Sequence, residues 1–253
     1  MAAASATSDY PRGNGTGGGG WTGADCALLL GLFAFAALRT ASLVFSPLEL
    51  GVDEAQYWLW STGFDFGYYT KPPLTSWIIG LSHGLFGHHE WAVRLPAPWL
   101  HLATSLVLWR AADWLAGPAA GRIAAMIWMT LPSIALGSFV ISTDTPLLLC
   151  WSAGVLALVG VLTGRLRERR GMVVAGGAFG AAMLAKYAAI YGLVGLALFV
   201  LATSVLPRDT ERQKVIGWRG LGLFALGMVA VASPNILWLS LIHISEPTRL
   251  RRI

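Results

Sequence analysis

Charged side chains are scarce in this sequence: Asp, Glu, Lys and Arg make up 12% of the 253 residues, whereas 55% are hydrophobic. Soluble domains carry about 25% charged residues, so this chain has too few charges to coat a large water-soluble protein. The mean hydropathy of +0.61 indicates the same. We therefore expect an integral membrane protein. Twelve Trp and six Tyr fit this class, because such rings settle at the lipid–water boundary.

Cysteine is also nearly absent. Cys26 and Cys150 both lie in apolar runs, which argues against a disulfide framework and against a metal knuckle. The chain is basic, with 18 Lys and Arg against 13 Asp and Glu, yet a nucleic-acid partner is not expected. Its basic residues fall in loops between apolar runs, which is typical of topology signals and not of a phosphate-binding face.

Both ends of the chain depart from the membrane pattern. Residues 1–20 are mostly small and polar, so we expect a disordered cytoplasmic tail that reaches residue 25. No signal-peptide cleavage pattern follows, and the first apolar run should remain as an anchor. From Leu239 the sequence turns polar and basic and resembles the translation of a sequencing adapter. We expect residues 239–253 to be an artefact that ends an N-terminal fragment; a genuine polar tail is the alternative.

Seven apolar runs approach the length of about 20 helical residues that crosses a bilayer. They are residues 26–45, 92–110, 120–141, 145–163, 172–188, 189–206 and 219–238. Another run, 74–87, is shorter and includes polar residues, which is more typical of an interfacial helix. Gly176, Gly177 and Gly180 follow a small-residue spacing that predicts close helix packing. The expected fold is an all-α polytopic membrane protein whose bundle covers residues 26–238, with residues 46–91 as an external loop.

Charge between the spans predicts the orientation. Ten of the fifteen basic residues before residue 239 lie in three loops, each separated from the next by two spans: 110–122, 165–170 and 208–219. The positive-inside rule places these loops in the cytoplasm. The N-terminus is then also cytoplasmic, provided that the run 74–87 does not cross; if it crosses, the N-terminus lies outside. Residues 46–91, rich in acids and aromatics, would then face the outside.

An acidic pair, Asp53 and Glu54, lies just beyond the first apolar run. An ionisable group near hydrocarbon costs about 2.5–3.5 kcal/mol on insertion scales, and by default it marks a functional site. The pair opens the stretch Asp53-Glu-Ala-Gln-Tyr-Trp-Leu-Trp60, and Gly67-Tyr-Tyr-Thr-Lys-Pro-Pro-Leu74 follows. The asymmetry between acidic outside and basic inside predicts an external active site.

These blocks resemble the first external loop of membrane-embedded GT-C glycosyltransferases, especially the branch of protein O-mannosyltransferases and lipid A aminoarabinose transferases. Further matching blocks follow in order: Ala92-Val-Arg-Leu-Pro96, Ser142-Thr-Asp-Thr-Pro-Leu147, Met183-Leu-Ala-Lys-Tyr187 and Ser233-Pro-Asn-Ile-Leu-Trp238. The resemblance implies a GT-C helix bundle in the cell (inner or plasma) membrane. It further implies transfer of a sugar from a polyprenyl-phosphate donor to a lipid, glycan or protein acceptor on the external face.

The resemblance also implies roles for individual residues. Asp53 would be the general base, with Glu54 as its neighbour in the catalytic site; displacement assisted by a single base predicts an inverting transferase. The donor phosphate would be bound by a basic and aromatic set: Lys71, Arg94, Lys186 and Tyr187. A divalent cation shared by Asp53 and Asp144 is the only cofactor expected.

Simpler roles stay open for each of these residues. Asp53 and Asp144 could cap helices, Glu54 could be an ordinary first-turn acid, and the basic residues could be anchors at the membrane surface. The run His88-His89-Glu90 suggests a metal site, but adjacent histidines point in different directions. A transporter or flippase for lipid-linked saccharides, or a non-catalytic subunit, is the alternative function. A transporter predicts polar, broken helices near the midplane, whereas the acids here lie in external loops.

Overall fold

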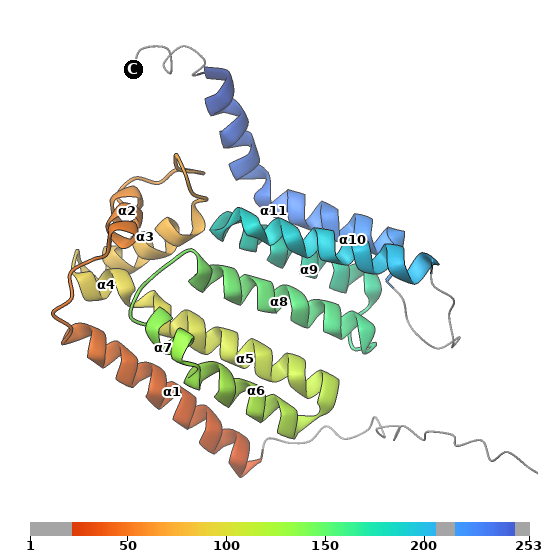
Figure 1. Ribbon diagram of the computed structural model, residues 1–253, viewed down its shortest axis with the longest axis horizontal. Helices are drawn as coiled ribbons and strands as arrows, with labels where there is room; N and C mark the ends of the chain where they lie inside the picture. The colour runs from red at the N-terminus through yellow and green to blue at the C-terminus, as the bar shows by residue number, and fades with distance from the viewer. Residues whose placement is uncertain (1–21, 206–215, 246–253) are drawn as a thin grey trace, which may run out of the picture.

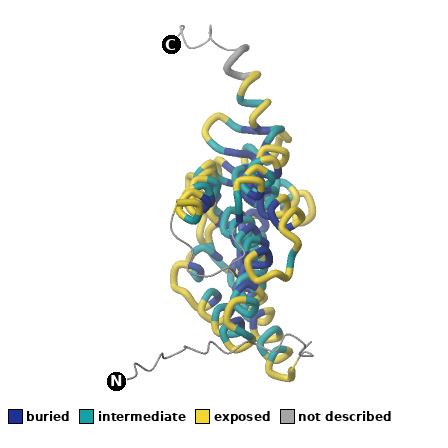
Figure 2. The backbone as a smooth tube through the Cα atoms, turned by 90° about the vertical axis from the view of Figure 1, so that its right-hand side faces the viewer, coloured by how far each residue is buried: buried dark blue, intermediate teal, exposed yellow. Residues whose placement is uncertain are grey.

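The computed structural model describes residues 22–205 and 216–245, with side chains described as far as residue 241. In this part of the chain every regular element is helical, which confirms the predicted all-α class. The long helices lie roughly side by side, while three short helices gather at one end of the molecule (Figure 1). The buried residues run along the middle of this assembly and exposed residues coat its flanks (Figure 2).

The elements differ widely in length. The long helices are α1 (Gly23–Val44), α5 (Pro96–Ala116), α8 (Asp144–Leu162), α9 (Glu168–Ala185), α10 (Ile190–Val205) and α11 (Trp218–Ser245). The shorter elements are α2 (Val52–Ser61), α3 (Leu74–Phe86), α4 (Glu90–Arg94), α6 (Pro118–Thr130), α7 (Pro132–Gly137) and the 3-10 turn η1 (Tyr187–Ala189). The long loop that leaves α1 contains α2, α3 and α4, and these are the three helices at the end of the bundle.

Four helical segments of the described chain are long and apolar enough to cross a membrane: α1, α8, η1 with α10, and α11 as far as Leu241. They match four of the seven predicted spans. Helices α5 and α9 have 21 and 18 residues and are not among these four segments. The total of seven spans stays a prediction. At about 1.5 Å per residue, the 13 residues of α3 are too short for a span, in keeping with an interfacial helix.

Prolines divide two of the predicted spans. Pro132 separates α6 from α7, and Pro96 begins α5 directly after α4. Proline lacks an N–H and its ring clashes with the preceding turn, so it begins a helix more readily than it continues one. The predicted spans 120–141 and 92–110 are therefore each built from two helices.

Helices α9 and α11 cross backbone to backbone through glycines. A Cβ atom added to Gly176 would lie 2.0 Å from the carbonyl oxygen of Phe224, and one on Gly180 would lie 2.6 Å from that of Met228. On the other helix, a Cβ on Gly227 would meet the carbonyl of Val173. Small residues allow membrane helices to approach in this way, as the glycine spacing predicts.

The predicted end segments are only partly covered by the structure. Thr22 caps α1, which begins at Gly23, and residues 1–21 of the predicted tail lie outside the described residues. Helix α11 continues past residue 238 to Ser245, and residues 246–253 lie outside the described part. The same holds for residues 208–215 of the third basic loop.

Candidate active site

Glu54 is buried at the first turn of α2, with 1% of its surface exposed. Arg94 donates to both carboxylate oxygens, from Nε to Oε1 at 2.9 Å and from Nη2 to Oε2 at 2.7 Å. The backbone N–H groups of Ile141 and Gly51 donate to the same two oxygens at 3.0 and 2.9 Å. Glu54 is thus a fully satisfied carboxylate that connects α2 with α4 and with the segment before α8.

The guanidinium of Arg94 is occupied on all three nitrogens. Besides Glu54, it donates to the carbonyl oxygens of Leu48 and Glu49 at 2.8 and 2.7 Å, and only 4% of the residue is exposed. Burial makes such a bidentate pair sensitive to the loss of either partner. The geometry therefore favours a positioning role for both residues, and a donor phosphate would have to displace these contacts to reach Arg94.

Asp53 is exposed, in contrast to its neighbour Glu54. The N-cap of α2 is Gly51, so Asp53 does not have the capping role that was left open for it. Tyr57 is buried one turn further along α2. Burial raises the pKa of Tyr57, as do the negative charges of Asp53 and Asp144, while a side-chain hydrogen bond with Thr143 opposes the shift. Tyr57 thus lies within the electrostatic reach of both acids and marks the corner where α2 meets the start of α8.

Asp144 and Lys186 form an ion pair between two helix ends. Lys186 Nζ lies 2.7 Å from Asp144 Oδ1, and the two side chains are 44% and 53% exposed. Asp144 is the first residue of α8, after the N-cap Thr143, and Lys186 is extended between α9 and η1. An ion pair this exposed contributes about 0–1 kcal/mol to stability. Its two charges are therefore accessible to a ligand at little cost to the fold.

Tyr187 belongs to a chain of hydrogen bonds that reaches the loop between α2 and α3. Its hydroxyl donates to Asn235 Oδ1 at 3.1 Å, and Asn235 Nδ2 donates to the carbonyl of Phe66 at 2.7 Å. Asn235 is 3% exposed and lies beside Pro234 within α11. Its contacts make Asn235 a structural link that the sequence reasoning did not assign, although an amide within an apolar run was a visible signal.

Lys71 precedes two buried prolines and the start of α3. Its side chain is half-buried, and its ammonium has no hydrogen bond or ion pair with any residue of the described ranges. Directly after the prolines, the hydroxyls of Thr75 and Ser76 are buried without a partner among these residues. Among the predicted phosphate ligands, Lys71 is therefore the cation that has no counter-charge among the described residues.

Aromatic rings give the loop between α2 and α3 its shape. Trp60 stacks on Tyr68 with centroids 5.1 Å apart, and Phe64 stacks on Trp77 at 5.2 Å. The indole N–H of Trp77 also donates to the carbonyl of Asp65 at 2.8 Å. These contacts fold the segment between α2 and α3 back over both helices. They hold the loop that leads to Lys71.

Arg39 lies in the C-terminal part of α1 and has no predicted role, although a lone arginine in an apolar run was a signal. It is 4% exposed, and it donates to the carbonyl of Met129 at 2.7 Å and to the hydroxyl of Ser138 at 3.0 Å. Pro132, which lacks an N–H, interrupts the helix that would otherwise satisfy the last carbonyls of α6. Arg39 supplies one of the missing donors and so fastens α1 to the break.

The segment 138–144 is consequently held at three points by charged side chains. Arg39 binds Ser138, Glu54 binds the N–H of Ile141, and Lys186 binds Asp144. These charged residues come from α1, α2 and the end of α9. Their convergence brings Asp144 to the corner that also contains Asp53 and Tyr57.

A divalent cation site is only partly built by these residues. Among the described residues, no three His, Cys, Asp or Glu side chains are grouped so that they could hold a metal ion. Asp53 and Asp144 could supply two oxygen ligands, and Asp144 already pairs with Lys186. The histidines diverge, as expected: His88 accepts a hydrogen bond from Trp58, whereas His89 stacks on Trp91. The shared cation stays a prediction.

Three comparisons place the chain among known proteins. The family model described as dolichyl-phosphate-mannose-protein mannosyltransferase matches residues 70–238. The chain is 33% identical over 228 residues to lipid A galacturonosyltransferase RgtD of Rhizobium johnstonii, a match that covers 87% of this chain and 45% of the relative. The crystal structure of ArnT from Cupriavidus metallidurans in the apo state has a similar fold, with a TM-score of 0.69 at 24% identity over 88% of this chain and 43% of ArnT. This chain therefore spans less than half the length of either protein.

Proposed function

The chain belongs to the dolichyl-phosphate-mannose-protein mannosyltransferase family, and from that premise we propose that it carries membrane-embedded catalytic elements of an inverting glycosyltransferase. The donor would be a sugar on a polyprenyl phosphate. The acceptor would be a hydroxyl or phosphate group of a membrane glycolipid, by analogy with the relative named for lipid A. The external loop and the adjoining ends of α8 and α9 would form the site on the external face of the inner membrane.

The observation that carries the proposal is the different environment of the two adjacent acids, Asp53 and Glu54. Glu54 is buried and neutralised by Arg94, whereas Asp53 is exposed, on a turn of α2 that these buried contacts hold rigidly. A general base must lie within reach of the proton that it removes, and the backbone around it must hold it in position. Asp53 meets both conditions.

The proposed reaction forms one bond and breaks one bond at the anomeric carbon. The acceptor hydroxyl attacks this carbon, its proton passes to the carboxylate of Asp53, and the bond to the phosphate oxygen breaks with both electrons on the phosphate. Attack from the face opposite the leaving group inverts the anomeric centre. The departing polyprenyl phosphate gains negative charge, which an ammonium group stabilises.

Lys71 is the proposed partner of the leaving phosphate, because its ammonium has no other partner among the described residues. Lys186 would be a second cation that exchanges Asp144 for the phosphate, since their ion pair is exposed. Tyr187 would orient this region through Asn235, and Arg94 would act through Glu54. A divalent cation, if bound by Asp53 and Asp144, would supply further positive charge for the same phosphate.

Transfer of a labelled sugar from a polyprenyl-phosphate donor to lipid A, with the chain in lipid nanodiscs, tests the reaction. Asp53→Asn keeps the size of the side chain and removes the base, so transfer should fall at least about a hundredfold, within the usual range for a general base. Binding of the polyprenyl phosphate should stay unchanged. Full transfer by this variant would overturn the role of Asp53.

Donor binding provides a second test that does not require turnover by this chain. Lys71→Gln should weaken binding of a short-chain polyprenyl phosphate about tenfold or more, because it removes one cation from the phosphate site. Arg122→Gln is the matched control. Arg122 pairs with Asp25 in the first turn of α1, whereas the loop that contains Lys71 follows the last turn of α1. Equal loss in both variants would contradict the assignment of Lys71.

A further inference from the structure

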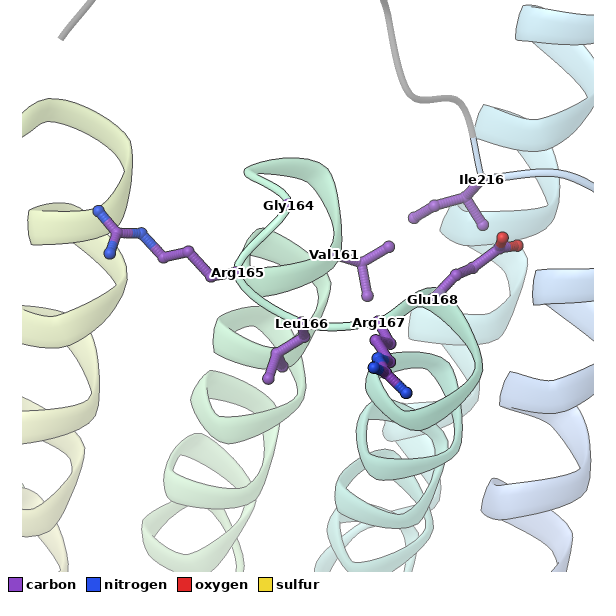
Figure 3. A pocket seen from close by; sticks show the side chains of 7 residues that line it. All are labelled: Val161, Gly164, Arg165, Leu166, Arg167, Glu168 and Ile216. Carbon is purple, nitrogen blue, oxygen red and sulfur yellow. The ribbon is translucent and has the colours of Figure 1, made fainter. Parts of the chain in front are cut away.

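A basic pocket lies at the end of the bundle opposite Asp53. It has a volume of about 310 Å³ and is formed at the turn between α8 and α9, where it is lined by Val161, Gly164, Arg165, Leu166, Arg167, Glu168 and Ile216 (Figure 3). A second hollow of about 560 Å³ adjoins it and extends the lining to Arg169 and Arg170. The turn follows the last residue of α8, whereas Asp144 is the first.

The length of α8 separates this pocket from the proposed catalytic site by roughly one membrane. Its 19 residues rise about 1.5 Å each, giving about 28 Å, close to the roughly 30 Å of a bilayer's hydrocarbon core. The two ends of α8 therefore lie at the headgroup levels of opposite leaflets. A ligand of the pocket at the α8–α9 turn belongs to the other leaflet from the proposed sugar donor.

The pocket has an excess of uncompensated positive charge. Arg165, Arg167, Arg169 and Arg170 are all exposed, and none of them has a hydrogen bond or ion pair from its side chain to another described residue. Among the described residues that line the pocket, Glu168 is the only carboxylate. The six residues 165–170 thus carry a net charge of +3. The N-terminus of α9, which has no side-chain cap, adds the positive end of a helix dipole.

The turn itself is tightly built. Gly164 adopts a φ of +74°, which suits glycine, and the N–H of Leu166 donates to the carbonyl of Gly160 at 2.8 Å. Leu166 packs where Gly160 and Gly171 lack side chains. This insertion sends Arg165 toward the neighbouring helix α5 and leaves Arg167 beside the first turn of α9 (Figure 3). The guanidinium of Arg165 lies over the ring of Trp114 on α5, 5.6 Å from its centroid, and Arg167, Arg169 and Arg170 complete the basic lining.

We propose that this pocket binds a phosphate-bearing anion, namely the headgroup phosphate of an anionic phospholipid in the adjacent leaflet. Guanidinium groups bind phosphate oxygens through paired N–H donors, and basic pockets between membrane helices bind anionic headgroups. Val161, Leu166 and Ile216 give the pocket an apolar wall. Next to the lining residue Val161, Leu162 is 43% exposed and offers an apolar contact for an acyl chain.

Orientation alone does not account for this arrangement. A topology signal requires positive charge near a span, and it does not require a pocket or a helix N-terminus among the charges. The proposal is independent of the transfer reaction, because the pocket shares no residue with the site around Asp53. It concerns a lipid that would stay bound while the sugar donor turns over.

The test is a lipid titration of the purified chain in neutral detergent micelles, with bound lipids counted by native mass spectrometry. Dioctanoyl phosphatidylglycerol is compared with zwitterionic dioctanoyl phosphatidylcholine, and inorganic phosphate is added as a competitor. The wild-type chain should retain phosphatidylglycerol in preference to phosphatidylcholine. Arg167→Gln/Arg170→Gln should weaken phosphatidylglycerol binding about tenfold or more.

Two further variants separate the pocket from general charge. Arg110→Gln/Arg122→Gln removes the same number of charges near this end of the bundle but outside the pocket lining, and it should leave the affinity within about twofold. Arg167→Lys/Arg170→Lys keeps the charge, loses the paired donors and should bind with intermediate affinity.

The outcomes divide clearly. Displacement of the lipid by millimolar inorganic phosphate would support a phosphate site whose natural ligand is soluble. Resistance to inorganic phosphate would identify the lipid headgroup as the source. Equal retention of both lipids by the wild-type chain, or equal losses in the pocket variant and the control variant, would overturn the proposal.

Discussion

Arg94 holds both carboxylate oxygens of Glu54 from 40 positions further along the chain, with N···O distances of 2.9 and 2.7 Å. The pair is buried, whereas the adjacent Asp53 is exposed. Successive residues of a helix point about 100° apart, so a buried Glu54 leaves Asp53 on a different face of α2. The acidic pair of the sequence is thereby divided into a buried residue that connects helices, Glu54, and an exposed residue, Asp53.

Glu54→Gln should destabilise the protein strongly. The variant leaves the charge of Arg94 buried without a counter-charge, and losing one partner of a buried pair costs about 3–5 kcal/mol. The midpoint of thermal unfolding in detergent should fall clearly. The exposed neighbour provides the matched control, since Asp53→Asn should leave the midpoint nearly unchanged. An unchanged midpoint for Glu54→Gln would show that the buried pair does not hold the loop.

Replacing both partners of the pair should cost less than replacing one. Glu54→Leu/Arg94→Met removes both charges together, so no buried charge is left unpaired. Its unfolding midpoint should lie between those of the wild type and Glu54→Gln. A double variant less stable than Glu54→Gln would indicate that the hydrogen bonds to Leu48, Glu49 and Ile141 dominate.

Asp144→Asn and Lys186→Gln should have opposite effects on donor binding. Asp144→Asn frees Lys186 from its carboxylate partner, so binding of a polyprenyl phosphate should tighten by a few fold. Lys186→Gln removes a cation and should weaken it. Titrations with and without EDTA provide the measurement. If Asp144→Asn instead weakened binding, and this difference from the wild type disappeared in EDTA, the result would support a cation held by Asp144.

Gly176→Ala should separate α9 from α11. The added methyl group would lie 2.0 Å from the carbonyl oxygen of Phe224, and backbone cannot yield as a flexible side chain does. Overpacking of this kind costs about 1–3 kcal/mol. Gly195→Ala, on α10, is the matched control because nothing lies within 4 Å of its added Cβ; it should be neutral or stabilising by up to about 1 kcal/mol. Equal unfolding midpoints for the two variants would contradict the close crossing.

Ionisation of Tyr57 should lower the stability of the protein at alkaline pH. Burial and then the charge of Asp53 raise the pKa of Tyr57 above its ordinary value of 10.0. Because the folded state holds this proton more tightly, its contribution to stability is complete below pH 10.0 and is lost as the pH rises through the higher pKa of the folded state. Tyr57→Phe should therefore reduce the alkaline loss of stability, measured as the unfolding midpoint between about pH 9 and 12.

Asp53→Asn offers an independent check on the same coupling. Removing the negative charge should move the pKa of Tyr57 down toward its ordinary value, since like charge disfavours the tyrosinate. The difference in ultraviolet absorbance between each protein and its Tyr57→Phe counterpart isolates this one tyrosine. An identical titration with and without Asp53 would place the acid outside the corner formed by α2 and α8.

Local features of the structure follow from the sequence. Apolar runs predicted the helical membrane class and the positions of the long helices, because hydrocarbon allows only backbone that satisfies its own hydrogen bonds. The helix breaks at Pro96 and Pro132 also have local causes, although each of the runs 92–110 and 120–141 was predicted as one span. The order of the motif blocks identified the family, since a family motif is itself local sequence.

The sequence by itself therefore determined the class of protein, the approximate extent of its helices and the residues on which the chemistry is proposed to depend. The tertiary structure alone decided which charges are neutralised and which stay free. Glu54 pairs with Arg94, Asp144 with Lys186, and Arg39 with Met129, and these partners are separated by 40, 42 and 90 positions in the chain. Spacing cannot predict such pairs, because they depend on how helices from distant parts of the chain pack against one another.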